Sequence, residues 1–190
     1  MKIDKDKINR LSPEDALPLM IRIKYFLFGR EKPDGFTRIT FTLSLFIWVL
    51  LTFWNAISYF VLLSSNIIEK NKGFSVQDII RKNGVSHGFS GPEFLEALRH
   101  FYFINNFIWG LIFIGLVLMY RKKRSYPLFI FLGLAVHFGY MFWNLGFQYL
   151  VQDISFFDKI CYAIFIFTII IHSWLMNKEK GEREPIQENF

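Results

Sequence analysis

The sequence predicts an all-α membrane protein: an antiparallel bundle of four transmembrane helices with an N-terminal interfacial helix. Three observations predict this fold. The 190-residue chain is 53% hydrophobic and only 20% charged, whereas soluble domains carry about 25% charged residues. Four stretches without Asp, Glu, Lys or Arg approach or exceed the roughly 20 residues that cross a hydrocarbon core. Backbone polar groups must be hydrogen-bonded inside lipid, so each stretch is expected to be helical.

The uncharged stretches and their flanks divide the chain into nine segments. The first covers residues 1–36 and contains an amphipathic helix. Spans and connections then alternate: first span 37–66, exterior loop with a short helix 67–98, second span 99–120, basic turn 121–125, third span 126–150, exterior turn 151–156, fourth span 157–177 and charged tail 178–190. Pro127 and Gly133 hint at an irregular helix in the third span.

Lys and Arg are concentrated on one side of the predicted bundle. Residues 1–38, the basic turn and the tail together hold 16 basic and 10 acidic residues, which accounts for the whole net charge of +6. Because basic loops stay in the cytoplasm, both termini are predicted to be cytoplasmic. Abundant Phe, Ile, Lys and Asn are typical of an AT-rich bacterial genome, which suggests the bacterial inner (plasma) membrane. The basic turn contains Arg121, Lys122, Lys123 and Arg124, which we interpret as a topology signal that contacts lipid headgroups.

The N-terminal segment carries the signals of a helix that lies on the membrane. Ser12 is suited to cap a helix and Pro13 to occupy its first position. Residues 16–28 then mix apolar and basic side chains and end at Gly29. This pattern predicts an interfacial helix on the cytoplasmic leaflet, which either orients the first span or docks a partner.

The exterior loop is expected to contain one short helix. Ser75 and Asp78 have capping-box spacing, and Asn83 with Gly84 is expected to close the helix. Glu93 is then expected to begin a helix that continues into the second span. Loops of this length between spans are often functional.

Polar residues inside three spans recur at helical spacing and therefore lie on single helix faces. The first span places Thr37, Thr40, Ser44, Trp48, Thr52, Asn55 and Ser58 on one face, the third Gly133, His137, Tyr140, Asn144 and Gln148, and the fourth Asp158, Cys161, Thr168 and His172. Because polar groups turned to lipid are costly, we expect these faces to meet one another, line a cavity or contact another subunit.

Many of the polar side chains fall in the half of the bilayer nearer the exterior loop. The candidate residues for helix packing or a polar cavity are Asn55, Ser58, His100, Asn105, Asn106, His137, Tyr140, Asn144, Gln148 and Asp158. Asn in a span forms interhelical hydrogen bonds worth about 0.6–2 kcal/mol, so specific packing is the simpler interpretation. A substrate or lipid cavity is the alternative.

Three residues of the spans have both a structural and a chemical interpretation. Asp158 suits the N-terminus of a helix, or it pairs with His100 in an ion or proton site. His137 is either a hydrogen-bonded packing residue, a haem or metal ligand, or a proton carrier. Cys161 is the single cysteine, so the chain cannot form an intramolecular disulfide. We interpret Cys161 as a small packing residue. The sequence has no catalytic or metal-ligand motif, so we predict no cofactor or metal.

Three functional classes fit this sequence. The favoured one is a non-catalytic membrane protein, acting as an accessory or scaffold subunit or as a self-assembling component. Its expected partners are the lipid bilayer and other membrane subunits or further copies of the chain, and no nucleic acid is expected. The second class is a channel, pore-forming effector or small transporter with a polar cavity. The third is an intramembrane enzyme or redox carrier that uses His100 or His137.

Overall fold

The computed structural model describes residues 19–29, 32–73 and 75–181 of the chain. Within these residues every regular element is an α-helix, which confirms the all-α prediction. The predicted helix start at Ser12 and Pro13 lies outside them.

Four helices are long and apolar enough to cross a membrane, as predicted from the uncharged stretches. They are α3 (Gly35–Leu63), α6 (Gly91–Tyr120), α7 (Tyr126–Gln152) and α8 (Phe156–Gly181). At 1.5 Å per residue, the 26 to 30 residues of each helix measure about 40–45 Å. The chain is therefore a helical protein with four candidate membrane spans, of the multi-pass class.

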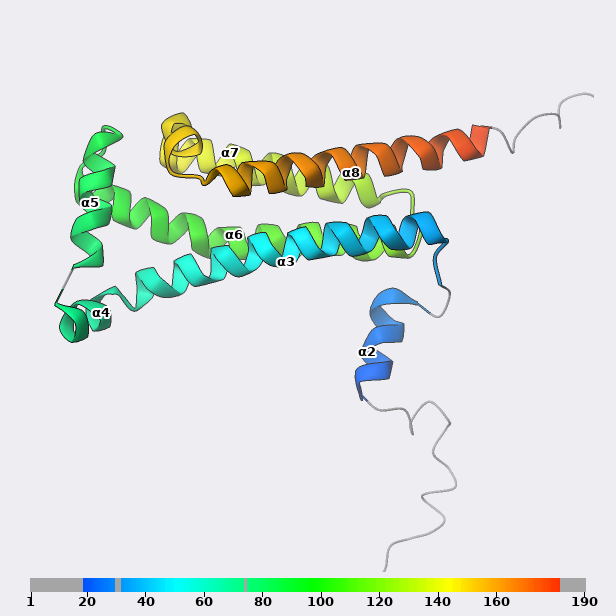
Figure 1. Cartoon of the computed structure of the whole chain (residues 1–190), viewed down its shortest axis with the longest axis horizontal. Coiled ribbons are helices and arrows are strands. Elements are labelled where there is room, and N and C mark those ends of the chain that lie inside the picture. Colours follow the sequence, from blue (N-terminus) through cyan, green and yellow to red (C-terminus); the bar gives the residue numbers. More distant parts are fainter. Residues whose placement is uncertain (1–18, 30–31, 74, 182–190) are drawn as a thin grey trace, which may run out of the picture.

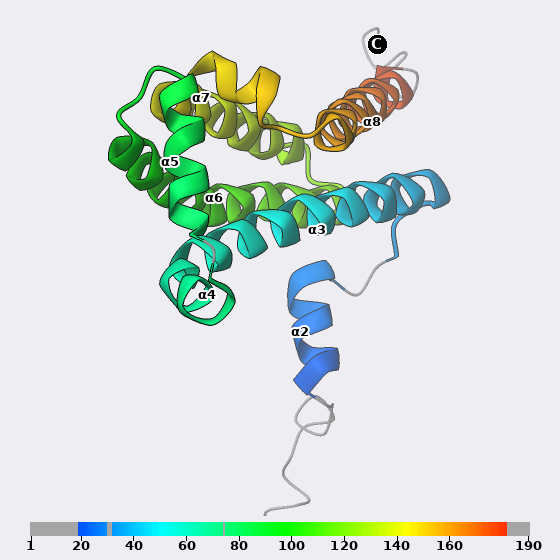
Figure 2. The same cartoon turned by 60° about the vertical axis from the view of Figure 1, so that its left-hand side comes forward.

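The four long helices lie side by side and do not pack equally (Figures 1 and 2). Helix α6 packs against α7 most extensively and against α3 next, while α8 packs on α3. The contact between α7 and α8 relies on long side chains. The ring of Tyr162 in α8, for example, lies 5.2 Å from the ring of Phe138 in α7. Side-chain chemistry therefore decides how α8 is held against α7.

Two glycines allow the close approach of α6 and α7. A Cβ atom on Gly133 would lie 2.5 Å from Cγ1 of Ile112, and one on Gly115 would lie 2.5 Å from Cγ1 of Ile130. Gly133 is therefore a packing residue, and Pro127 lies in the first turn of α7, where proline is tolerated. The irregularity occurs instead at Gly146, whose φ of 76° and ψ of 167° break the helix.

The core consists of two apolar clusters. One contains Leu51, Trp109 and Leu134 and extends toward the basic turn. The other contains Leu62, Phe101 and Met141 and extends toward the opposite end. Between these positions along α3, α6 and α7 lie buried Asn55, Asn105 and His137. A polar layer therefore separates two apolar halves.

The connection between α3 and α6 contains two short helices, α4 (Ser65–Lys72) and α5 (Val76–Ser86), rather than the single one predicted. Ser75 caps α5 as expected, because its side chain accepts a hydrogen bond from the Asp78 N–H. The predicted closure at Asn83 and Gly84 is wrong. Gly84 is buried inside α5, where a Cβ atom would lie 2.4 Å from Cβ of Phe94.

Helix α5 ends at Ser86, and the chain turns away from it at Gly88, whose φ is +84°. The Phe89 N–H donates to the Gly84 carbonyl and the Gly88 N–H to the Val85 carbonyl, a pattern that closes helices at a left-handed residue. Helix α6 then begins at Gly91, and the Glu93 carboxylate accepts from the Ser90 N–H. The helix continues into the second span, as predicted.

Helix α2 (Leu19–Phe28) ends at Gly29, as the sequence predicts. In both views it projects away from the four long helices, near the end where α3 begins in Figure 1. Its last residue anchors it: the Phe28 ring packs edge-on against Phe41 of α3 and Tyr120 of α6.

Candidate functional site

A continuous chain of hydrogen bonds connects the four long helices at the polar layer. It begins in α8 with the Tyr162 hydroxyl, 2.9 Å from Nε2 of His137 in α7. The other ring nitrogen, Nδ1, lies 2.6 Å from Oδ1 of Asn105 in α6. His137 is 2% exposed, and both of its nitrogens are therefore bonded within the protein. We call Tyr162, His137, Asn105, Asn55 and Asn106 the central chain.

The central chain continues through three side-chain amides. Asn105 Nδ2 donates to Oδ1 of Asn55 in α3 over 2.7 Å, and Asn55 Nδ2 donates to Oδ1 of Asn106 over 2.9 Å. Asn106 Nδ2 donates in turn to the backbone carbonyl of Tyr102. The chain thus leaves α6, crosses to α3 and returns to the backbone of α6.

All donors of the central chain point in the same direction. Asn105 donates through Nδ2, so its Oδ1 is the acceptor for His137 and Nδ1 carries the ring proton. In the neutral ring Nε2 is then left to accept from the Tyr162 hydroxyl. Bonds aligned in this way polarise one another and strengthen the whole chain.

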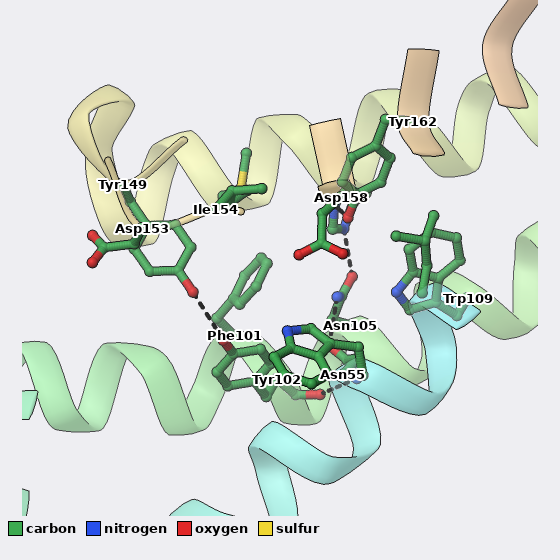
Figure 3. Close-up of a pocket in the computed structure, with 14 residues that line it drawn as sticks. Asn55, Phe101, Tyr102, Asn105, Trp109, Tyr149, Asp153, Ile154, Asp158 and Tyr162 are labelled. Carbon is green, nitrogen blue, oxygen red and sulfur yellow. Dashed lines mark hydrogen bonds between the residues drawn. The ribbon is translucent and has the colours of Figure 1, made fainter. Parts of the chain in front are cut away.

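A polar cavity of about 70 Å³ lies beside the central chain (Figure 3). Figure 3 shows Trp109 and Asn105 of α6 facing Asp158 and Tyr162 of α8 across it. The Trp109 indole N–H is buried and has no protein partner in the described part of the chain. A polar cavity of this size is large enough to hold a few water molecules. We call it the polar cavity.

The polar cavity extends toward the α5 end of the molecule. The Tyr102 and Tyr149 hydroxyls, which join α6 to α7, lie 2.8 Å apart at its wall. Asp153 also lines it, and Oδ2 of Asp153 lies 2.5 Å from Nε2 of His87 in the turn after α5. The connection between α3 and α6 therefore contacts the rim of the polar cavity.

A second chain lies at the other end of the helices, beside the basic turn. Oη of Tyr126 lies 2.6 Å from Nδ1 of His172, whose Nε2 lies 3.1 Å from Oγ1 of Thr37. The Thr37 hydroxyl donates to Asp34 over 2.9 Å, and Lys122 Nζ lies 2.8 Å from the same carboxylate. We call these five residues the basic-end chain. It joins α7, α8, α3 and the basic turn.

Asp34 is the charged terminus of the basic-end chain. Its carboxylate accepts from the Thr37 N–H and so caps α3. Partial burial acts to raise its pKa, but hydrogen bonds from Lys122 and from Thr37, with the charge of Lys122, hold the pKa well below its ordinary value of 3.8. The carboxylate is therefore ionised at neutral pH and accepts from both partners.

The remaining candidate residues lie apart from the central chain. His100 and Gln148 are exposed. Asn144 donates to the Tyr140 carbonyl one turn earlier in α7, and the Tyr140 ring stacks on Phe101. Ser58 lines a neighbouring apolar groove. The structure therefore joins four of the ten candidates, Asn55, Asn105, Asn106 and His137, directly through side chains.

Asp158 lies in the first turn of α8, at the polar cavity. Its N–H donates to Oγ of Ser155, and the Ser155 hydroxyl donates to its carboxylate over 2.8 Å. Within the described residues Asp158 is thus bound by Ser155 at a helix N-terminus, while His100 is exposed on α6. Cys161 is buried in the apolar cluster nearer the basic turn.

No group of three or more His, Cys, Asp or Glu side chains that could hold a metal ion occurs in the part of the chain that the structure describes. His137 and His172 belong to separate hydrogen-bonded chains. The structure thus brings together no pair of these histidines that suits a haem.

The tyrosines of both chains are absent from the candidate residues. Tyr162 follows Asp158 by four residues and Tyr126 precedes His137 by eleven, and both spacings place the two residues on one helix face. That periodicity is the signal that identifies them. Asp34 carries a different signal, because its position just before a span is typical of a helix cap.

The central chain, the basic-end chain and the polar cavity are the features of this molecule on which a functional interpretation rests. Comparison of the chain with protein-family models, with curated proteins and with solved structures finds no match in any of the three.

Proposed function

We propose that this protein is a small non-catalytic membrane protein, an accessory or scaffold subunit or a self-assembling component of a bacterial inner membrane. The four long helices cross the bilayer as an antiparallel bundle. The basic turn and both termini lie in the cytoplasm, and α2 lies on the cytoplasmic surface. This orientation follows from the distribution of Lys and Arg.

The observation that carries the proposal is the composition of the central chain. Three of its five members are amides, and an amide does not readily accept and release a proton at neutral pH. The chain ends on the Tyr102 carbonyl, which cannot pass a proton on. Its bonds instead connect four helices, at about 0.6–2 kcal/mol each. This supports a role in fixing the packing of the bundle.

The surfaces available to a partner are the apolar outer faces of the spans. Trp143 of α7 is 89% exposed, Phe167 of α8 64% and Phe53 of α3 63%. Four of the polar residues that suggested assembly, Asn55, Asn105, Asn106 and His137, bond to one another within the protein. Lipid, other membrane subunits and further copies of the chain therefore meet the protein mainly through aromatic and aliphatic side chains.

The proposal is tested by the size of the protein in the membrane. We expect the chain, with a monomer mass of 22.7 kDa, to be extracted in a larger assembly or together with another membrane protein. Light scattering corrected for detergent, after cross-linking in native membranes, measures this size. A monomer in several detergents, with no cross-linked neighbour in the native membrane, contradicts the proposal.

The polar cavity favours one alternative function, a pathway for protons or small cations. It is lined by the carboxyl groups of Asp153 and Asp158 and by the unpaired Trp109 N–H. For such a pathway we expect flux into liposomes that Asp158→Asn reduces. Asp78→Asn on the exposed face of α5 is the matched control. Flux no greater than that of empty liposomes removes this alternative.

A further inference from the structure

A cavity at the basic end has the features of an anion-binding site. It measures about 420 Å³, within the range of small-molecule sites. Its lining residues are Phe28, Gly29, Lys32, Pro33, Tyr120, Arg121, Lys122 and Lys123. These come from the end of α2, the segment before α3 and the end of α6 with the basic turn. We call it the basic cavity.

Cationic side chains make up half of the wall of the basic cavity. They are Lys32, Arg121, Lys122 and Lys123, and no acidic side chain lines the described wall. The Asp34 carboxylate, which pairs with Lys122, also accepts from the Thr37 N–H. That leaves a clear excess of positive charge facing the cavity.

Helix dipoles do not account for this excess. The C-termini of α2 and α6 meet here, and each carries a partial negative charge that basic residues stabilise. The N-termini of α3 and α7 lie beside them and carry partial positive charges of similar size. These four partial charges oppose one another, so the charge of the side chains dominates.

The backbone of the basic turn is arranged so that Lys122 reaches Asp34. Lys122 has a φ of +53°, the one positive value outside glycine in the described part of the chain. The Lys123 N–H donates to the Leu118 carbonyl and the Lys122 N–H to the Met119 carbonyl, so Lys122 occupies the position where helices usually place glycine. The ion pair with Asp34 thus joins the wall formed by the turn to the start of α3.

Phe28 and Tyr120 form an aromatic part of the wall of the basic cavity, and Phe41 packs against both of them. Rings of Phe28, Phe41 and Tyr120 pack edge-on with centroids 4.8–5.7 Å apart. Arg121 lies over the end of α2, with its Nε 3.9 Å from the position of a Cβ on Gly29. A cationic rim therefore adjoins an apolar wall, which is the arrangement that suits a charged head attached to an apolar tail.

We infer that the basic cavity binds the phosphate of an anionic phospholipid headgroup between α2 and the basic turn. This rests on the proposed placement of α2 and the turn at the cytoplasmic surface, where anionic lipids are exposed. Basic cavities between helices at that surface are suited to phosphate-bearing headgroups. The four cations hold the phosphodiester, and the aromatic wall contacts the first carbons of the lipid tails.

Lipid binding to the full-length protein tests this inference. The protein in neutral detergent is titrated with phosphatidylglycerol and, separately, with phosphatidylcholine, and bound lipids are counted by native mass spectrometry. We expect tighter binding of phosphatidylglycerol. The triple variant Lys32→Gln, Arg121→Gln and Lys123→Gln is expected to weaken it at least about tenfold. Lys122 is left unchanged because it also pairs with Asp34.

Two controls separate the cavity from general charge and from folding. Lys70→Gln, Lys82→Gln and Arg99→Gln remove the same charge at the other end of the molecule and should leave binding unchanged. Lys32→Arg with Lys123→Arg keeps the charge and should retain binding. Equal loss in the two Gln triples, or no preference for phosphatidylglycerol, overturns the inference.

Inorganic phosphate distinguishes a lipid headgroup from a free anion. We expect phosphatidylglycerol to stay bound in millimolar phosphate, because free phosphate cannot make the lipid's contact with the aromatic wall. Complete displacement identifies a site for free phosphate and overturns the assignment to lipid. Bound lipid is counted for each mass species, so a monomer that binds phosphatidylglycerol contradicts the proposed assembly but supports this inference.

Discussion

The central chain and the basic-end chain both begin with a tyrosine and a histidine, but they end on different groups. Each begins with a tyrosine hydroxyl that donates to a buried histidine, and each crosses between α7 and α8. The two rings differ in tautomer. His137 carries its proton on Nδ1, and His172 carries it on Nε2, because the Thr37 hydroxyl donates to Asp34 and so accepts from Nε2.

The ends of the two chains differ more than their beginnings. The central chain passes through amides to a backbone carbonyl between two apolar clusters. The basic-end chain reaches a carboxylate that is partly exposed and paired with Lys122. The central chain thus ends on buried backbone, whereas the basic-end chain ends on a charged pair near the surface. The two buried histidines are therefore bonded in different electrostatic surroundings.

Replacing His137 has the largest expected effect. His137→Leu removes the hydrogen-bond partner of both the Tyr162 hydroxyl and Oδ1 of Asn105, and we expect the unfolding free energy to fall by about 2–4 kcal/mol. His172→Leu should cost about half as much, because Thr37 keeps its bond to Asp34 near solvent. Unfolding by SDS titration in mixed micelles measures both. An equal or larger loss for His172→Leu contradicts the comparison.

The second largest effect is expected where α6 and α7 pack closely, at a position between the central chain and the basic-end chain. Gly133→Ala places a Cβ atom 2.5 Å from Ile112 and should lower the unfolding free energy by about 1–3 kcal/mol. Gly139→Ala is the matched control in the same helix, because a Cβ there meets nothing within 4 Å. The control should be neutral or slightly stabilising. Equal behaviour of the two variants contradicts the tight α6–α7 contact.

The charge of Asp34 gives the basic-end chain a pH dependence. Its pKa in the folded protein lies below its ordinary value of 3.8, so its stabilising effect is present above that value and is lost as the pH falls toward the folded pKa. Asp34→Asn keeps a cap for Thr37 but removes the charge. We expect about 1 kcal/mol between the two proteins at pH 7, and less at pH 3. SDS titration at both values checks this, and a difference independent of pH contradicts it.

The smallest effect is expected at Lys122. Lys122→Gly removes the strain of a left-handed backbone conformation, which costs a non-glycine residue about 1 kcal/mol. It also removes an exposed ion pair that stabilises the protein by about 0–1 kcal/mol. The two effects nearly cancel. Lys122→Ala keeps the strained backbone and loses the pair, so it should be about 1 kcal/mol less stable than Lys122→Gly. If the two variants unfold alike, backbone strain at Lys122 is absent.

The polar residues show how far the sequence predicts the candidate site. Helical periodicity placed Asn55 and His137 on polar faces, and both are buried in the polar layer. It also included Gln148 on the α7 face, although the break at Gly146 precedes this residue and its side chain is exposed. Periodicity assumes an unbroken helix, so its prediction fails beyond a break.

Local signals account for what the sequence determined by itself. Apolar length defined four spans, Ser75 capped a helix and Gly29 ended another, because hydropathy and capping depend on neighbouring residues. Tertiary packing decided that Gly84, inside α5, lies against Phe94, and that His137 lies between Tyr162 and Asn105. Such pairs depend on the rotation and axial offset of whole helices, which contacts between distant residues set together.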